Sequence, residues 1–228
     1  MGIREGRRRH PVVPAKIEAP SEAVRRIRPG AIVMVGGFGH SGVPMKLVDA
    51  LLDTPVGDLT VISNNIGRPG EGLGKWLRAG KIKKVIGTYF TTNPEVAEAY
   101  LEGKIEVELL PQGTFSEAIR AGGSGIAAFY TPTAADTELA RGKEVRQING
   151  QLCVLERALR ADVALIKAYK ADELGNLVYY KTARNFNPIM AMAADLTIAE
   201  VDEIVPAGAL DPECIVTPHV FVDILVKG

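Results

Sequence analysis

Short apolar runs recur along the first half of the chain, separated by longer segments of mixed polarity. The runs span residues 31–35, 59–62, 84–90 and 105–110. The first of them, residues 31–35, is continuously apolar, which is typical of a strand that is buried on both faces of a parallel sheet. We therefore predict four strands in this part of the chain.

The segments between these runs carry signals for helix starts. Ser21 and Asn93 suit the N-cap position, and Pro44 and Pro94 suit the first turn of a helix. The sequence Thr114-Phe115-Ser116-Glu117 matches a capping box, which predicts that a helix begins there. Strands that alternate with helices at this spacing predict a parallel sheet with helices on its faces.

The pattern changes after residue 125. Residues 142–155 predict an antiparallel pair of strands that turns at Asn149-Gly150. A helix is predicted from Asn187 to Ala194, and further strands at residues 161–168, 176–180, 196–201 and 220–226. The predicted fold class is α/β, with an open, mainly parallel sheet flanked by helices and an antiparallel β-rich lobe. We expect one domain at residues 21–228, preceded by a frayed or disordered tail at residues 1–20.

Composition and charge exclude several classes of function. Lys plus Arg and Asp plus Glu both total 27, and this neutral balance gives no support to a nucleic-acid or polybasic membrane partner. No apolar run approaches the roughly 20 residues that span a bilayer. The basic residues 7–9 lead into no apolar segment of a secretory signal. We expect a cytoplasmic protein in which Cys153 and Cys214 are reduced, buried thiols without metal-ligand spacing.

A glycine-rich loop follows the first predicted strand. Gly37-Phe38-Gly39-His40-Ser41-Gly42 reads G-x-G-x-x-G between a strand and a helix, as a dinucleotide-binding fingerprint does. That fingerprint needs an acid at the end of the next strand, where this chain has Ser63-Asn64-Asn65, so a nicotinamide or flavin site is disfavoured. Glycines and a helix N-terminus can still bind an anion or a carbonyl oxygen. A tight strand-to-helix turn without a ligand is the structural alternative.

The loop is part of a longer block, Val35-Gly36-Gly37-Phe38-Gly39-His40-Ser41-Gly42-Val43-Pro44, which resembles the signature of the alpha (A) subunit of family I coenzyme A (CoA) transferases. Further blocks resemble this family and follow in its order. They are Ser63-Asn64-Asn65-Ile66-Gly67, Leu110-Pro111-Gln112-Gly113-Thr114, Ile119-Arg120-Ala121-Gly122-Gly123, Phe129-Tyr130-Thr131-Pro132-Thr133, Asp162-Val163-Ala164-Leu165-Ile166-Lys167-Ala168, Lys170-Ala171-Asp172 and Ala183-Arg184-Asn185-Phe186-Asn187-Pro188. The resemblance covers nearly everything from residue 21 to residue 228, and is closest to the succinyl-CoA:3-oxoacid branch.

The resemblance implies a division of labour between two chains. Members of the family move CoA between carboxylic acids through a covalent thioester on a glutamate, which two-chain members carry in a Ser-Glu-Asn-Gly motif of the beta (B) subunit. This chain lacks that motif, and its Ser21-Glu22 and Ser116-Glu117 pairs fall at predicted helix starts. The resemblance therefore implies no catalytic residue, no metal and no permanently bound cofactor here, with a CoA thioester as substrate. The implied partner is the CoA-transferase beta subunit, in an A2B2 heterotetramer or an AB heterodimer.

The implied reaction moves CoA from succinyl-CoA to a 3-oxoacid such as acetoacetate. An acetate:acetoacetate or a 3-oxoadipate CoA-transferase fits the same residues. Two remoter alternatives are a nucleotide-binding oxidoreductase and a non-catalytic sensor of acyl-CoA. A neighbouring reading frame that encodes Ser-Glu-Asn-Gly would favour the transferase over the sensor.

The resemblance also implies site residues. A CoA-binding loop that faces the beta subunit would consist of Gly36, Gly37, Phe38, Gly39, His40, Ser41 and Gly42. Asn64 and Gln112, each at the carboxyl end of a predicted strand, would hydrogen-bond the acyl carboxylate or keto group, and we expect the three loops to converge. For Gln112 a role in the turn alone is the alternative.

Other residues near these loops have simpler interpretations. We expect Asn65 to support a turn, Trp76 to lie in the core or in an interface, and His40 to be a variable loop residue without a carboxylate partner. Arg184 either binds an anion or forms an ion pair near the cap of the helix at Asn187.

Two segments depart from the family pattern. Relatives commonly have Thr-Pro-Thr-Gly-x-Gly-Thr where this chain has Thr131-Pro132-Thr133-Ala134-Ala135-Asp136-Thr137. Losing both glycines removes easy access to positive φ, so we expect this loop to differ from that of relatives. The segment Gly67-Arg68-Pro69-Gly70-Glu71 also looks unusual and is expected to alter acyl selectivity.

Overall fold

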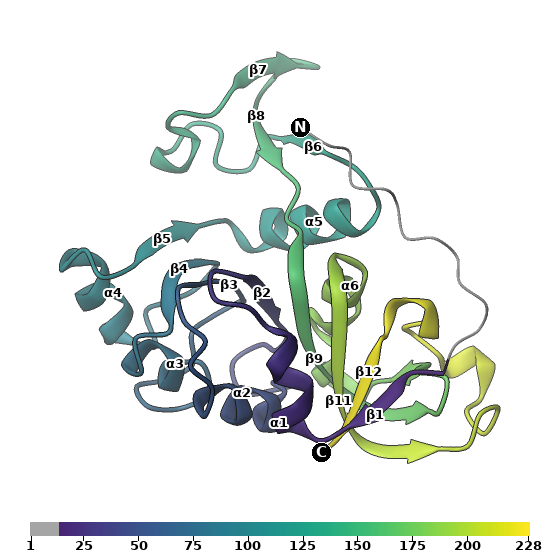
Figure 1. Ribbon diagram of the computed structural model, residues 1–228. Coiled ribbons are helices and arrows are strands. Elements are labelled where there is room, and N and C mark those ends of the chain that lie inside the picture. Colours follow the sequence, from purple (N-terminus) through teal and green to yellow (C-terminus); the bar gives the residue numbers. More distant parts are fainter. Residues whose placement is uncertain (1–13) are drawn as a thin grey trace.

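The computed structural model describes residues 14–228, which form a nine-stranded main sheet with helices on both faces (Figure 1). The strand order is β1-β12-β11-β9-β2-β3-β4-β5, with every neighbouring pair parallel and with β10 antiparallel to β9. The strands are β1 (Lys16–Glu18), β2 (Ile32–Val35), β3 (Leu59–Ile62), β4 (Ile82–Gly87), β5 (Glu106–Leu109), β9 (Ala161–Asp172), β10 (Leu177–Val178), β11 (Ala194–Val205) and β12 (Ile224–Lys227). The predicted mainly parallel sheet is confirmed.

Helices cover the sheet on both sides. The α-helices are α1 (Pro20–Ala23), α2 (Met45–Leu52), α3 (Gly74–Arg78), α4 (Pro94–Leu101), α5 (Gln112–Gly123) and α6 (Asn187–Met192). Short 3-10 turns are η1 (Val24–Arg26), η2 (Glu138–Ala140), η3 (Lys181–Arg184), η4 (Pro212–Cys214) and η5 (His219–Phe221). Residues of α1 to α4 belong to one hydrophobic cluster and residues of α5 and α6 to another, so the two groups of helices pack on opposite faces.

The apolar run of β2 shows why both faces are covered. Val33 and Val35 join the cluster under α1 to α4, whereas Met34 between them joins the cluster under α5 and α6. Successive side chains of a strand point to opposite faces, so a continuous apolar run requires a helical layer on each. Trp76 of α3 is fully buried in the first cluster, and its indole N–H donates to the carbonyl of Val48 at 2.8 Å. The expectation that Trp76 belongs to the core is confirmed.

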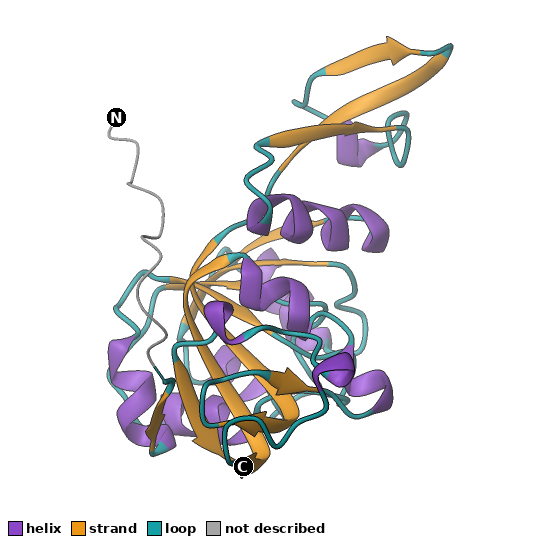
Figure 2. Ribbon diagram, turned by 90° about the vertical axis from the view of Figure 1, so that its right-hand side faces the viewer, coloured by secondary structure: helices purple, strands orange, loops and turns teal. Residues whose placement is uncertain are grey.

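The predicted lobe is a separate antiparallel sheet of order β6-β8-β7, made of β6 (Ala128–Thr131), β7 (Val145–Ile148) and β8 (Gln151–Arg157). Its hairpin turns at Asn149 and Gly150, which both have positive φ, as a two-residue type I′ turn requires. Figure 2 shows the lobe standing clear of the main sheet, beyond α5. The lobe has only a small buried cluster of its own: Ala135, Ala140 and Val154.

Two predicted helix starts are wrong by a few residues. Helix α5 begins at Gln112, after Pro111 as N-cap, so Thr114 lies inside the helix instead of capping it. Pro111 has no N–H to satisfy, and the helix starts directly from it. Similarly α1 begins at Pro20, because proline at the first position of a helix is already set to the helical φ. The Asn93 cap is confirmed, since its side chain accepts a hydrogen bond from Glu95 N.

The folded chain also starts earlier than expected. Residues 1–13 of the predicted tail lie outside the described part of the chain. Within the described part, Lys16–Glu18 form strand β1, which pairs with β12 at the edge of the sheet. The predicted boundary at Ser21 is therefore too late.

One thiol differs from expectation as well: Cys153 is buried in β8, but Cys214 at the surface turn η4 is exposed.

The loop at residues 131–137 contains a left-handed residue although it has no glycine. Ala134 has φ +64, in the region that glycine adopts at no steric cost. Thr137 then caps η2 by accepting a hydrogen bond from Leu139 N. The turn and the cap that follow it hold Ala134 at positive φ, and the expected difference from the loop of relatives stays a prediction.

This strain makes Ala134→Gly a stabilising change. A left-handed residue other than glycine costs about 1–2 kcal/mol, part of which glycine loses again through its greater freedom in the unfolded chain. We expect the free energy of unfolding to rise by about 0.5–1 kcal/mol in chemical denaturation. Ala127→Gly, at a residue of ordinary φ just before β6, is the matched control and should lower it. A lower stability for Ala134→Gly would contradict the assignment of strain.

Candidate functional site

Three loops meet at the carboxyl edge of the main sheet, as the sequence predicted. They follow β2, β3 and β5, and Thr88 joins them from the end of β4. In parallel sheets the carboxyl ends of neighbouring strands lie along one edge, where open α/β folds bind their ligands. The candidate site is built from these loops.

The glycine loop after β2 forms a tight hairpin. Phe38 N donates to Ser41 O and Ser41 N donates to Phe38 O, both at 3.0 Å, which leaves Gly39 and His40 as the two turn residues. Gly39 has φ +59 and His40 does not have positive φ, the pattern of a type II′ turn with glycine at its first central position. The tip is exposed, and half of the Phe38 surface is accessible to solvent (50%). The loop therefore presents a fixed, solvent-facing turn.

The base of the loop is packed so closely that only glycine fits. A Cβ on Gly36 would lie 1.8 Å from Asn187 Oδ1, and one on Gly42 would lie 2.5 Å from the carbonyl of Ala183. Contacts this short are not compatible with any side chain. By contrast, a Cβ on Gly39 would meet nothing within 4 Å. Gly36 and Gly42 are thus required by packing, whereas at Gly39 only the backbone conformation favours glycine.

Asn64 and Gln112 are brought together by a hydrogen-bond network. The Nδ2 of Asn64 donates to Thr88 Oγ1 at 2.7 Å and to Gln112 Oε1 at 2.9 Å. Asn64 is buried, with 3% of its surface exposed, whereas Gln112 is exposed at the start of α5. The expected convergence of the loops is therefore confirmed. Both amide hydrogens of Asn64 are occupied within the chain, so its contact with a substrate stays a prediction.

Asn65 has the turn role expected of it. Its Oδ1 accepts a hydrogen bond from Gly67 N at 2.8 Å, and its Nδ2 donates to Asn64 Oδ1 at 3.1 Å. Ser63 ties this loop to β2, because its hydroxyl donates to the carbonyl of Val35 at 2.9 Å. The loops after β2 and β3 are thus held in register with each other.

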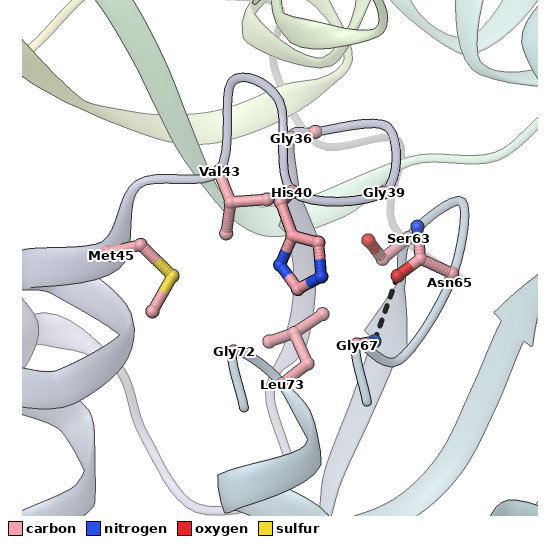
Figure 3. Close-up of a pocket in the computed structure, with 11 residues that line it drawn as sticks. Gly36, Gly39, His40, Val43, Met45, Ser63, Asn65, Gly67, Gly72 and Leu73 are labelled. Atoms are coloured by element: carbon pink, nitrogen blue, oxygen red, sulfur yellow. Dashed lines mark hydrogen bonds between the residues drawn. The ribbon is translucent and has the colours of Figure 1, made fainter. Parts of the chain in front are cut away.

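A pocket opens between these two loops (Figure 3). Four of the seven predicted loop residues line it: Gly36, Gly37, Gly39 and His40. Its wall continues through Ser63, Asn65, Gly67, Gly72 and Leu73. Asn64 and Gln112 do not line this pocket, but Asn64 is hydrogen-bonded to Asn65, which does. The unusual segment at residues 67–71 thus contributes Gly67 to the wall.

The N-terminus of α2 is not available to an anion, contrary to the expectation from the sequence. The buried carboxylate of Glu200 accepts hydrogen bonds from Lys46 N at 2.8 Å and from Leu47 N at 3.2 Å. These N–H groups are the ones that a helix leaves unpaired at its start. Because the Glu200 carboxylate already occupies these N–H groups, the start of α2 offers them to no other anion.

The negative charge of Glu200 is balanced by the positive charge of Lys167 in β9. The Lys167 ammonium lies 3.2 Å from Glu200 Oε1 and 2.5 Å from Asp202 Oδ1. Partial burial acts to lower the pKa of Lys167, but the hydrogen bond to Asp202 and the charge of Glu200 outweigh it and raise the pKa above its usual value. Lys167 therefore stays protonated and pairs with Glu200 and Asp202 beneath the loop.

Two residues that the sequence did not single out as site residues support the loop from behind. Asn185 and Asn187, between η3 and α6, hydrogen-bond the backbone of Gly37, Ser41 and Gly42. The signal was present, because both belong to a block that resembles the family. It was interpreted only as a helix cap.

His40 and Arg184 show no catalytic arrangement. The imidazole Nε2 of His40 lies 3.7 Å from Glu71 Oε2, with 60% and 57% of the two side chains exposed. Such an exposed contact contributes little, so the expectation that His40 has no carboxylate partner needs only this small correction. Arg184 is exposed and forms no ion pair with a described residue.

Residues 14–228 contain no group of His, Cys, Asp and Glu that could hold a metal. Among the helices of these residues, none has the length and apolar character of a membrane span.

Comparison with known proteins identifies the fold and the family. The family model described as coenzyme A transferase matches residues 17–228. This chain belongs to that family. The resemblance inferred from the sequence blocks is therefore confirmed, and the oxidoreductase alternative is set aside.

Close relatives carry the names of alpha (A) subunits. The chain is 49% identical over 212 residues to the alpha subunit of a probable succinyl-CoA:3-ketoacid coenzyme A transferase of Bacillus subtilis, covering 93% of this chain and 89% of the relative. It is 51% identical over 211 residues to the alpha subunit of the 3-oxoadipate CoA-transferase of Pseudomonas putida, covering 92% and 91%. Among solved structures, an acyl-CoA transferase from Escherichia coli matches with a TM-score of 0.81 at 19% identity, covering 94% of this chain and 47% of that one.

Proposed function

We propose that this chain is the alpha subunit of a heteromeric CoA-transferase that moves CoA from succinyl-CoA to a 3-oxoacid such as acetoacetate. The observation that carries the proposal is the meeting of the glycine hairpin and the Asn64–Gln112 pair at one edge of the sheet. Backbone N–H groups suit the carbonyl oxygen of a thioester, and side-chain amides suit a carboxylate or keto group. Relatives of about half-identical sequence with matching names support the same interpretation.

In this proposal the chain binds and orients, while the covalent thioester forms on a glutamate of the beta subunit. The N–H groups of the loop that contains residues Gly36 to Gly42 contact the CoA thioester. Gln112 contacts the acyl carboxylate or keto group, since its Nε2 makes no hydrogen bond to another described residue. Asn64 either joins that contact by releasing one of its two bonds or orients Gln112 for it.

The acceptor acid is the open part of the proposal. The relative named for 3-oxoadipate is as similar as those named for 3-ketoacids, so identity alone does not separate the two substrates. An acetate:acetoacetate transferase uses the same site chemistry. Transfer rates measured across succinyl, acetyl, acetoacetyl and 3-oxoadipyl pairs would rank the alternatives.

The proposed partner is a CoA-transferase beta subunit, in an A2B2 heterotetramer or an AB heterodimer. Relatives named as alpha subunits support this, and so do single chains such as the Escherichia coli transferase, of which this chain matches only 47%. A cytoplasmic location stays a prediction, as does the absence of a permanently bound cofactor.

We expect the purified chain alone to show no CoA transfer. It has no Ser-Glu-Asn-Gly motif, and Glu117 of the Ser116-Glu117 pair is a half-buried helix residue whose side chain binds Arg120. Co-expression with a candidate beta subunit that carries the motif should restore turnover, measured by the conversion of succinyl-CoA and acetoacetate. Turnover by a preparation proven free of a second chain would contradict the division of labour.

The same experiment tests the sensor alternative. A non-catalytic sensor would bind an acyl-CoA, as measured by calorimetry, but would stay inactive with every candidate beta subunit. Restored transfer excludes it.

A further inference from the structure

Asn185 and Asn187 form hydrogen bonds with the backbone at both ends of the glycine loop. Asn185 Oδ1 accepts a hydrogen bond from Gly37 N at 3.2 Å, and Asn185 Nδ2 donates to Ser41 O at 3.0 Å. Asn187 Nδ2 donates to Gly42 O at 3.0 Å. The loop is thereby bound at three successive points by side chains about 145 positions away in the sequence.

The two asparagines are themselves tightly held. Asn187 is fully buried, and its Oδ1 accepts from Lys167 N of β9 at 2.9 Å. The missing Cβ of Gly36 leaves the space that the Asn187 amide occupies. Asn185 has φ +22 and ψ −120, a strained backbone that persists only where the surroundings enforce it. These observations indicate a rigid clamp rather than incidental contacts.

The clamp determines which N–H groups of the loop remain available. Gly37 N is used by Asn185, and the N–H groups of Phe38 and Ser41 are used within the hairpin. Gly39 and His40 make no backbone hydrogen bond through N–H within the described chain, and both line the pocket. Only the tip of the hairpin therefore presents unpaired donors to the pocket from residues 37–41.

We propose that Asn185 and Asn187 are positioning residues, which fix the hairpin so that the N–H groups of Gly39 and His40 bind an acceptor oxygen of the CoA thioester. This inference rests on the proposed function for the identity of the ligand. The clamp itself does not, because it can be tested on the loop without any substrate.

The first test measures hydrogen exchange of the loop amides in the full chain, free and assembled with the beta subunit. Asn185→Ala removes the acceptor of Gly37 N and should raise exchange at Gly37 by about tenfold, as expected for one lost hydrogen bond. Asn185→Asp keeps that acceptor and should leave Gly37 near its wild-type protection. Unchanged exchange at Gly37 in Asn185→Ala would overturn the clamp.

The matched control is Asn176→Ala. Asn176 also bonds backbone and a side chain, through His219 N and Asp172 Oδ2, but in the turn between β9 and β10. The Asn176→Ala variant should have a lower melting temperature but unchanged hydrogen exchange at Gly37. Asn187→Asp serves as a second, isosteric variant, because Asn187→Ala removes a fully buried group that the fold itself needs.

The second test measures KM and kcat for succinyl-CoA in the assembled enzyme. Asn185→Ala should raise KM by about tenfold with a smaller change in kcat. The looser loop must then be ordered when the ligand binds, and this entropic cost weakens binding. Loosened exchange with unchanged KM would overturn the positioning role. If the wild-type enzyme bound no CoA thioester, the proposed function would fail, while the exchange result would still decide whether the clamp exists.

Discussion

Replacing Asn64 by alanine is expected to slow CoA transfer by the assembled enzyme by about 10²–10³-fold, the usual cost of removing a positioned donor that faces developing charge. Asn64 is buried at the sheet edge and holds both Thr88 and Gln112. Its loss removes one candidate donor and also the bond that orients the exposed Gln112. Both consequences reduce transfer.

Asn64→Asp should be as damaging or worse, although it keeps the shape of the side chain. A carboxylate at this position repels an anionic substrate in addition to losing the donor. Folding should tolerate the change, because the Thr88 hydroxyl and the Gln112 amide can both rotate to donate to the new carboxylate. The measurement is the transfer rate of each variant beside its melting temperature.

Gln112→Ala separates direct contact from orientation. If Gln112 is the contact and Asn64 only orients it, Gln112→Ala will match Asn64→Ala, and the double variant will be no slower than either. If both contact the substrate, the double variant will be slower than each single one. Near-normal turnover in Asn64→Asp would show that the residue does not face the substrate carboxylate and belongs to the turn.

The fold was predictable wherever burial alone determines the pattern. The run at residues 59–62 is a strand with the same bounds in the structure, and the run at 31–35 differs from β2 only at its start. Buried parallel strands need apolar side chains on both faces, so the sequence carries the signal without any knowledge of tertiary contacts. The hairpin at Asn149-Gly150 was equally clear, because two adjacent residues of positive φ restrict the choice of side chains.

What could not be predicted depends on contacts between distant parts of the chain. Glu200 caps α2 from 154 residues away, which made an apparently open helix N-terminus a satisfied one. Asn185 supports Gly37 from 148 residues away, although the sequence around it is typical of a plain helix start. Neither pairing has a local signature, since each needs the sheet to bring β11 and α6 beside the loop after β2.

At Ala134 a local backbone preference is overridden by the surrounding structure. Alanine disfavours positive φ, yet the turn before η2 holds it there. Asn64 and Gln112 form a third case. Their positions at strand ends correctly predicted that they meet, but not that they would satisfy each other by hydrogen bonding.

Gly39→Val is expected to reduce transfer by the assembled enzyme about 10²-fold while leaving the chain folded. Valine at φ +59 costs about 1–2 kcal/mol of strain, a few degrees of melting temperature in a chain of this size. No neighbour obstructs its side chain, because nothing lies within 4 Å of a Cβ at this position. The larger effect on activity follows from bulk at the tip that must approach the ligand, where even a displacement of about 1 Å can cost about 10²-fold.

Gly103→Val isolates the cost of the backbone. Gly103 follows α4, has φ +70 and likewise has nothing within 4 Å of a Cβ, so the same substitution imposes the same strain away from the site. Both variants should therefore lose similar stability, measured as melting temperature, but only Gly39→Val should lose transfer. Equal losses of activity in the two variants would mean that the turn at Gly39 serves folding alone. A hairpin tip that tolerates valine without loss of transfer would also contradict the assignment of its N–H groups to the CoA thioester, because the β-branched side chain would stand between those groups and the ligand.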